Sequence, residues 1–79
     1  MYTTHYSNLK RNEIGTIQEE SFAGAPLLSI LYLDNNKLWG LPSNAFAQNS
    51  QLKTLQLNHN DLTSLPGTLL TVNTGLYSL

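Results

Sequence analysis

Leucines recur along the chain at fixed spacings, and an asparagine falls at the same place in each group of them. From residue 28 to residue 46 the order is LxxLxLxxNxLxxLPxxxF, in which the asparagine is Asn36 and the phenylalanine is Phe46. The leucine, asparagine and proline positions return 24 residues later, from Leu52 to Pro66. Self-similarity at a fixed period of this size predicts a stack of similar structural units.

A weaker copy of the same pattern precedes these two. Asn12 and Phe22 lie 24 positions before their counterparts, but Thr4 and Ser7 occupy the first two leucine positions. We therefore expect one domain over residues 1–79. Its parts are a degenerate first repeat at 4–27, a second repeat at 28–51, a third at 52–75 and a truncated fourth at 76–79.

The spacing within each copy predicts a short strand followed by a turn. Leu31 and Leu33 alternate with polar or exposed positions, which indicates a strand with one buried face. The asparagine follows where the chain must turn, and its amide can bond backbone groups that the turn leaves unpaired. Stacked repeats would place Asn12, Asn36 and Asn60 one above another, each satisfying the neighbouring loop.

A second apolar series is expected on the side away from the strands. Phe22, Phe46 and Leu70 share one repeat position and would form a spine there. Pro42 and Pro66 can open a short helical or irregular return segment before it. No copy can bury its apolar face alone, so stability must come from stacking.

This pattern resembles the typical leucine-rich repeat of the 24-residue class, over about residues 4 to 79. The resemblance implies an α/β fold: a leucine-rich-repeat solenoid with a short parallel sheet on its concave face and irregular or short helical segments on its convex face. Members bind partners, most often proteins, through the concave sheet, and this class is commonest in extracellular and receptor proteins. Members often carry a buried leucine three residues after the phenylalanine. Because Ala25, Asn49 and Asn73 stand there, we expect a loosely packed convex side.

Composition narrows the function classes without choosing a compartment. The chain has no cysteine, which excludes disulfides and cysteine-based zinc sites. Its formal net charge of −1 does not favour nucleic acid or an anionic membrane as the partner. No apolar run is long enough to cross a bilayer, and residues 1–6 lack the apolar segment of a signal peptide. An extracellular or cell-surface location is therefore implied by the resemblance alone.

The side chains between the core leucines should project from the concave sheet and form the candidate partner-binding face. They are Tyr6, Asn8, Lys10, Tyr32, Asp34, Lys37, Gln56, Asn58, His59 and Asp61. Tyr6 and Tyr32 would serve as anchors, because tyrosine offers large area and one polar tip. Equivalent residues form columns. The simplest interpretation of columns such as Glu13, Lys37 and Asp61 is pairing of opposite charges across repeats, worth about 0–1 kcal/mol per pair.

Trp39 lies at the rim of this face. Its repeat equivalents are Gly15 and Thr63, so the position does not belong to the core. We favour an indole that folds over its own repeat and covers Leu41. The alternative is a contact with a partner at the rim.

Catalytic, cofactor and metal sites are not expected, so the chain is predicted not to be an enzyme. His5 and His59 occupy different repeat positions two copies apart and would not converge on one metal ion. The run from Asp34 to Asn36 resembles the start of a calcium loop, but Leu38 and Trp39 occupy the positions that need an oxygen ligand and a glycine.

The expected function is non-enzymatic protein–protein recognition by part of a larger receptor-like protein. The alternative is a structural or self-assembly module that pairs through uncapped terminal repeats, since Leu76 and Leu79 would begin a strand with an open edge. A third, weaker alternative is a non-catalytic segment of a larger enzyme or receptor.

Overall fold

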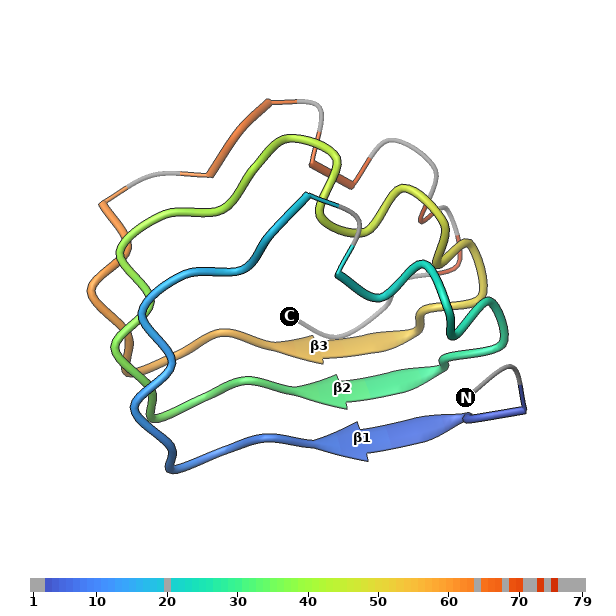
Figure 1. The fold of residues 1–79 in the computed structure, drawn as a ribbon, viewed down its shortest axis with the longest axis horizontal. Helices are drawn as coiled ribbons and strands as arrows, with labels where there is room; N and C mark the ends of the chain where they lie inside the picture. The colour runs from blue at the N-terminus through green and yellow to red at the C-terminus, as the bar shows by residue number, and fades with distance from the viewer. Residues whose placement is uncertain are drawn as a thin grey trace.

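The structure is a computed structural model that describes residues 3–19, 21–63, 65–67, 69–70, 73 and 75. Within these residues the chain forms three short strands in one parallel sheet: β1 (Tyr6–Asn8), β2 (Ile30–Tyr32) and β3 (Thr54–Gln56). In Figure 1 the strands lie side by side along one side of the molecule, and the chain returns along the opposite side. We call each 24-residue repeat, which holds one strand, a rung: rung 1 is residues 4–27, rung 2 is residues 28–51 and rung 3 is residues 52–75.

The strands pair in register with the 24-residue period of the sequence. Leu31 of β2 lies opposite Ser7 of β1 and Leu55 of β3. Both leucines are fully buried, whereas Ser7 is half-buried. The strand β1 forms despite its polar opening, because the pairing uses backbone groups that serine and leucine share.

Backbone pairing continues past the ends of the strands. The N–H of Leu9 donates to the carbonyl of Tyr32 at 2.8 Å, and that of Arg11 donates to the carbonyl of Asp34 at 3.1 Å. Rungs 2 and 3 are joined by the equivalent bonds at 2.9 and 3.0 Å. The rungs are therefore held in register over a longer stretch than the strands themselves.

Each rung turns sharply at one residue with a left-handed backbone. These residues are Arg11, Asn35 and His59, with φ angles of 60°, 59° and 58°. Asparagine and histidine are among the side chains that enter this region most readily, and arginine is not. The turn of rung 1 is therefore the most strained of the three.

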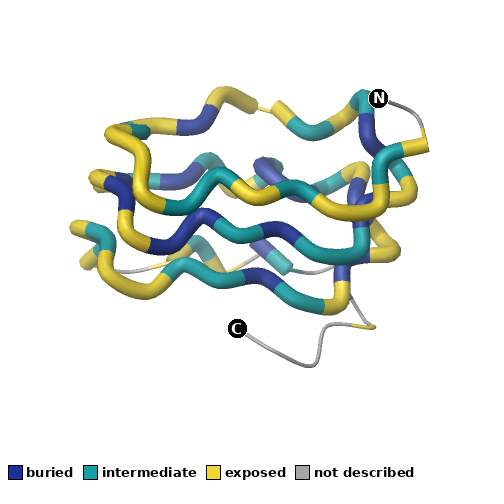
Figure 2. The backbone as a smooth tube through the Cα atoms, turned by 90° about the horizontal axis from the view of Figure 1, so that it is seen from below, coloured by how far each residue is buried: buried dark blue, intermediate teal, exposed yellow. Residues whose placement is uncertain are grey.

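The core consists of leucines that face inward from the strands and from the segments after them. No leucine of rung 2 that belongs to the repeat pattern is more than 9% exposed, and these are Leu28, Leu31, Leu33, Leu38 and Leu41. Leu65, the rung 3 equivalent of Leu41, is 40% exposed. Figure 2 shows the same difference, with buried residues concentrated in the middle rung. Rung 2 is buried best because it has a neighbour on each side, and each fully buried leucine stabilises the fold by about 1.5–3 kcal/mol.

The expected apolar spine is confirmed. The rings of Phe22 and Phe46 stack with their centroids 5.9 Å apart and an interplanar angle of 19°. Phe46 is fully buried, and Leu70 is half-buried against the same core. One apolar side chain per rung, a phenylalanine in rungs 1 and 2 and Leu70 in rung 3, therefore holds successive return segments together.

The return segments are irregular rather than helical over the residues that the structure describes. In rung 2 the N–H of Ala45 donates to the carbonyl of Pro42 at 3.1 Å, and the N–H of Asn49 to that of Phe46 at 3.1 Å. Bonds of this spacing close single turns. The sequence left open a short helical or an irregular return segment. The structure has the irregular form, built from a series of turns.

The predicted stack of asparagines after the strands is confirmed, and we call Asn12, Asn36 and Asn60 the strand-side ladder. The Nδ2 of Asn36 donates to the carbonyls of Leu9 and Leu33 at 3.0 and 2.9 Å. In the next rung, the Oδ1 of Asn60 accepts from the N–H of Leu38 at 2.9 Å. The amides of Asn36 and Asn60 therefore each tie their own turn to the turn of the rung before, whereas the amide of Asn12 bonds only carbonyls of its own turn.

A second set of asparagines, which the sequence did not lead us to expect, lies on the opposite side of the core. The Nδ2 of Asn49 donates to the carbonyls of Phe22 and Ala25, both at 3.0 Å. The Nδ2 of Asn73 donates to the carbonyls of Phe46 and Asn49 at 3.4 and 2.6 Å. We call Asn49 and Asn73 the return-side ladder.

The expectation of a loosely packed convex side is wrong, because the residues at this repeat position are buried. Asn49 is fully buried, and Ala25 and Asn73 are each 3% exposed. The amides replace the contacts of leucine by hydrogen bonds to the previous rung, so the segment packs closely without an apolar residue. The expected start of a fourth repeat at Leu76 and Leu79 lies outside the described residues.

Candidate functional site

The side of the sheet that faces away from the core carries two side chains from each strand. The central residue of β2 and that of β3 are fully buried, and the residues on either side of them are half-buried. This outer face is lined by Tyr6, Asn8, Ile30, Tyr32, Thr54 and Gln56. It corresponds to the face expected to be concave, and its residues point away from the leucine core because successive side chains of a strand alternate.

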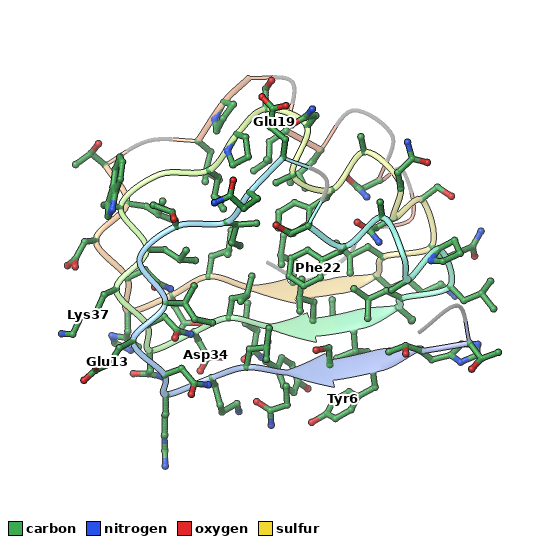
Figure 3. The ribbon with its side chains drawn as sticks, in the orientation of Figure 1. Tyr6, Glu13, Glu19, Phe22, Asp34 and Lys37 are labelled. Carbon is green, nitrogen blue, oxygen red and sulfur yellow. The ribbon has the colours of Figure 1, made fainter. Side chains whose placement is uncertain are left out.

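Two tyrosines and a lysine meet on the outer face. The rings of Tyr6 and Tyr32 pack edge to face with centroids 5.6 Å apart at 90°, and the Nζ of Lys10 lies 4.6 Å from the centroid of the Tyr32 ring. The Nδ2 of Asn8 donates to the Tyr6 hydroxyl at 3.3 Å. Tyr6 remains 52% exposed, and Figure 3 shows it pointing away from the core. We call Tyr6, Tyr32 and Lys10 the tyrosine cluster.

The third rung supplies polar side chains to the same side of the molecule. Gln56 is half-buried, whereas Asn58, His59 and Asp61 are exposed. His59 sits at the left-handed turn, which directs it differently from a strand residue. The proposed binding role of these four residues stays a prediction.

Asp34 does not have the exposure that we expected for a binding residue. It is only 6% exposed, and its Oδ2 accepts from the Nδ2 of Asn35 at 2.9 Å. Its repeat equivalents, Lys10 and Asn58, are half-buried and exposed. The carboxylate is covered because it belongs to the middle rung and has a neighbouring rung on each side.

The expected charge columns lie partly on the face and partly at its edge. Lys10 is placed over the ring of Tyr32, while the neighbouring carboxylate of Asp34 takes its hydrogen bond from Asn35. Lys37, like Glu13, is exposed on the segment after the turn, and Figure 3 shows both at the edge of the molecule. Their role in binding or in register also stays a prediction.

Trp39 is the most exposed large apolar residue of the described chain, at 67%. A Cβ built on Gly15 would lie 3.7 Å from the indole Nε1 of Trp39. The indole therefore lies against Gly15 of the previous rung. The expectation that it also covers Leu41 of its own rung stays a prediction. The absence of a side chain at Gly15 leaves room for this contact.

Sequence reasoning assigned no binding role to the residues just before the strands. His5, Ser29 and Lys53 share this position and border a hollow next to the outer face. The 24-residue spacing of these three residues is the sequence signal that could have identified them as a column beside the sheet.

The described part of the chain contains no group of three or more histidine, cysteine, aspartate or glutamate side chains placed to hold a metal ion. Nor does it contain a helix with the length and apolar character needed to span a membrane.

Comparison with known proteins agrees with the geometry of the rungs. The sequence profile described as leucine rich repeat matches residues 26–74, which is more than half of the chain. No curated protein matches the chain. Repeats of this family generally mediate protein–protein interaction and are typically non-catalytic. The three-stranded parallel sheet, the asparagines after each strand and this match together show that the chain belongs to the leucine-rich repeat family.

Proposed function

We propose that this chain is a non-enzymatic module that recognises a partner protein through the outer face of its sheet. The observation that carries the proposal is the tyrosine cluster, in which two aromatic rings are held edge to face while Tyr6 stays half exposed. Aromatic side chains give a large contact area at low entropic cost and are enriched among residues that dominate binding. A cluster already ordered in the free chain loses little further freedom when a partner docks.

The remaining candidate residues would surround this anchor. In this proposal Asn8, Lys37, Gln56, Asn58, His59 and Asp61 form the polar rim of the interface, and Trp39 lies beyond it. A rim of this kind excludes water from the central contacts while contributing little energy itself. Asp34 is left out, because its burial means that its replacement would test folding rather than binding.

We also propose that the module forms one stretch of a solenoid in a larger receptor-like protein, outside the cell or at its surface. The 24-residue repeat, which is commonest in such proteins, supports this part of the proposal. Self-association through terminal repeats is the alternative, and the molar mass of the chain by light scattering at two concentrations separates the two. A mass that rises with concentration would favour self-association.

The binding test selects ligands for the full chain from a random 12-residue peptide library displayed on phage. The affinity of each selected peptide is then measured by fluorescence anisotropy for the natural chain and for Tyr32→Ala and Tyr6→Ala. We expect Tyr32→Ala to weaken binding roughly tenfold or more, as a central aromatic contact does. Tyr6→Ala should weaken it several-fold.

Trp39→Ala is the matched control, because it removes a larger and more exposed aromatic ring from outside the face. It should change the affinity less than about twofold, within the range of near-neutral contacts. Peptides whose affinity is unchanged by both tyrosine variants but falls with Trp39→Ala would place the binding site at the rim. Circular dichroism of each variant shows that the fold is retained.

A further inference from the structure

A shallow hollow of about 180 Å³ opens beside the outer face, where the strands begin. It is lined by His5, Leu27, Ser29, Gln51 and Lys53. Its volume is many times the roughly 10–15 Å³ that a cavity needs to hold one water molecule, so it has room for one side chain.

The repeat itself builds this hollow. The N–H of Ser29 donates to the carbonyl of His5 at 2.8 Å, and the N–H of Lys53 donates to the carbonyl of Ser29 at 2.8 Å. The three residues are therefore fixed one above another by their backbones. Ser29 is smaller than His5 and Lys53 on either side of it, so this column of three residues is recessed in the middle. Leu27 and Gln51, which are also 24 residues apart, lie beside the column.

The charge of the hollow has one sign. Among the residues that the structure describes, the ionisable side chains that line it are His5 and Lys53, and none of these lining residues carries a carboxylate. Lys10 of the tyrosine cluster adds a second lysine on the same side of the molecule. The carboxylate of the strand region, Asp34, is buried and already accepts a bond from Asn35.

This local charge contrasts with the chain as a whole, whose formal net charge is −1. Exposed carboxylates lie elsewhere: Glu13 and Asp61 follow the turns, and Glu19 lies on the side opposite Tyr6 in Figure 3. Positive charges gathered beside the two tyrosine rings favour an incoming group of negative charge.

We propose that the hollow takes the carboxylate side chain of an aspartate or glutamate in the partner that docks on the tyrosine cluster. An ammonium group, a protonated imidazole and a serine hydroxyl can each donate to carboxylate oxygens, and bonds from charged donors are the stronger ones. The inference rests on the proposed function and adds the chemistry of the partner: an acidic segment with its acidic residue toward the start of the strands.

The direct test uses a defined probe, hexaglutamate with an amidated carboxyl end and an uncharged fluorophore coupled to its amino end. The terminal carboxyl group is blocked and the label adds no charge, so only side-chain carboxylates remain. We expect saturable binding that weakens roughly threefold to fivefold in Lys53→Gln and in His5→Gln at pH 6, as for a partly exposed ion pair. Ser29→Leu, which fills the hollow and keeps every charge, should weaken binding at least as much.

Arg11→Gln is the matched control, because it removes one positive charge from an exposed residue that lies outside both the hollow and the proposed interface. Equal losses in Arg11→Gln and Lys53→Gln would show non-specific attraction and overturn the inference, as would unchanged binding in Ser29→Leu. Binding only by a probe with a free carboxyl end would overturn the assignment to side chains.

The peptide selection described above separates failure of the inference from failure of the proposed function. Selected peptides rich in aspartate or glutamate, with binding that depends on Tyr32 and Lys53, support both. Selected peptides whose binding depends on Tyr32 but which lack acidic residues would support the proposed function and overturn the assignment of the hollow as a carboxylate site. Peptides insensitive to Tyr32→Ala and Tyr6→Ala contradict the proposed function itself.

Discussion

The two asparagine ladders use the same side chain on opposite sides of the core, but they satisfy different backbone groups. In the strand-side ladder the Oδ1 of Asn36 accepts from the N–H groups of Asn12 and Ile14 at 3.1 and 3.3 Å. Neither N–H has another acceptor among the residues that the structure describes. Asn36 is therefore their sole partner.

In the return-side ladder the amide only adds to bonds that already exist. The carbonyls of Phe22 and Ala25, which accept from Asn49, also accept backbone N–H groups of their own turns, at 3.0 and 3.1 Å. The Oδ1 atoms of Asn49 and Asn73 are buried and accept no hydrogen bond from the described residues.

The difference lies in what each backbone group can accept or donate. An N–H makes one good bond, whereas a carbonyl oxygen has two lone pairs. Losing the sole partner of a buried N–H costs the full desolvation penalty, and losing the second bond of a carbonyl costs less. Asparagine is thus required at positions 36 and 60 of the strand-side ladder, where its Oδ1 accepts from N–H groups, and replaceable in the return-side ladder.

The largest effect is expected from a charge in the return-side ladder. At pH 7 we expect Asn49→Asp to lower the free energy of unfolding by about 4 kcal/mol, because a buried carboxylate there would face carbonyl oxygens. Burial without donors raises the folded-state pKa of the new carboxyl. The variant should therefore be closest to the natural chain below the unfolded pKa of about 3.9, and should lose stability as the pH rises to the folded pKa.

Urea unfolding of the variant and the natural chain at each pH from 3 to 7 measures this loss. Asn36→Asp is the control, since its Oδ1 keeps two N–H donors. It should lose less than Asn49→Asp at pH 7. The reverse order would show that the two ladders do not differ in the way described.

The next effect tests the strand-side ladder by removing its hydrogen bonds. Asn36→Leu should cost about 3 kcal/mol, because it leaves the N–H groups of Asn12 and Ile14 without a partner. Asn12→Leu should cost less than about 1 kcal/mol, since the exposed Asn12 amide bonds only carbonyls of its own turn. Equal losses of stability in urea would contradict the assignment of the N–H groups to Asn36.

The same substitution in the other ladder should be milder. We expect Asn49→Leu to cost about 1 kcal/mol, since both carbonyls keep a backbone bond and the leucine buries apolar surface in place of an unpaired oxygen. Thermal unfolding followed by circular dichroism measures the difference. A loss as large as that of Asn36→Leu would mean that the amide bonds of Asn49 are as necessary as those of Asn36.

The smallest effect concerns the turn next to the strand-side ladder. Arg11→Asn should raise the free energy of unfolding by about 0.5 kcal/mol, because asparagine enters the left-handed region more readily than arginine. The exposed His59 already occupies this conformation, so His59→Arg is the inverse control and should lower stability by a similar amount. Urea midpoints that move in the same direction for both variants would refute the explanation.

The 24-residue period was sufficient to predict the strands, their register, the strand-side ladder and the phenylalanine spine. Each of these depends on one repeat position having the same role in every copy. The return-side ladder could not be predicted this way, because Ala25, Asn49 and Asn73 do not share one residue type and leucine was expected there. Hydrogen bonds to a neighbouring rung replaced apolar contacts, which a hydrophobic pattern does not reveal.

The candidate site shows the same limit. The period placed Tyr6 and Tyr32 on the outer face, where the structure finds them in contact. It could not show that Asp34 is covered, because exposure depends on which rungs flank a residue. Nor could it place Trp39 against Gly15, since that contact depends on the missing side chain of another rung.

The hydrogen bonds between rungs also determine where the chain can change its length. In rung 2, residues 40–45 make no hydrogen bond to the described residues of either neighbour, whereas bonds to neighbours are present at Trp39 and at Phe46. An insertion in this stretch would enlarge one loop and leave the alignment of both ladders unchanged. A Gly-Ser-Gly insertion after Ser43 should therefore leave the urea midpoint nearly unchanged. The same insertion after Asn36 should remove the cooperative unfolding transition. The side opposite the sheet is the place where a foreign loop can be grafted onto this scaffold.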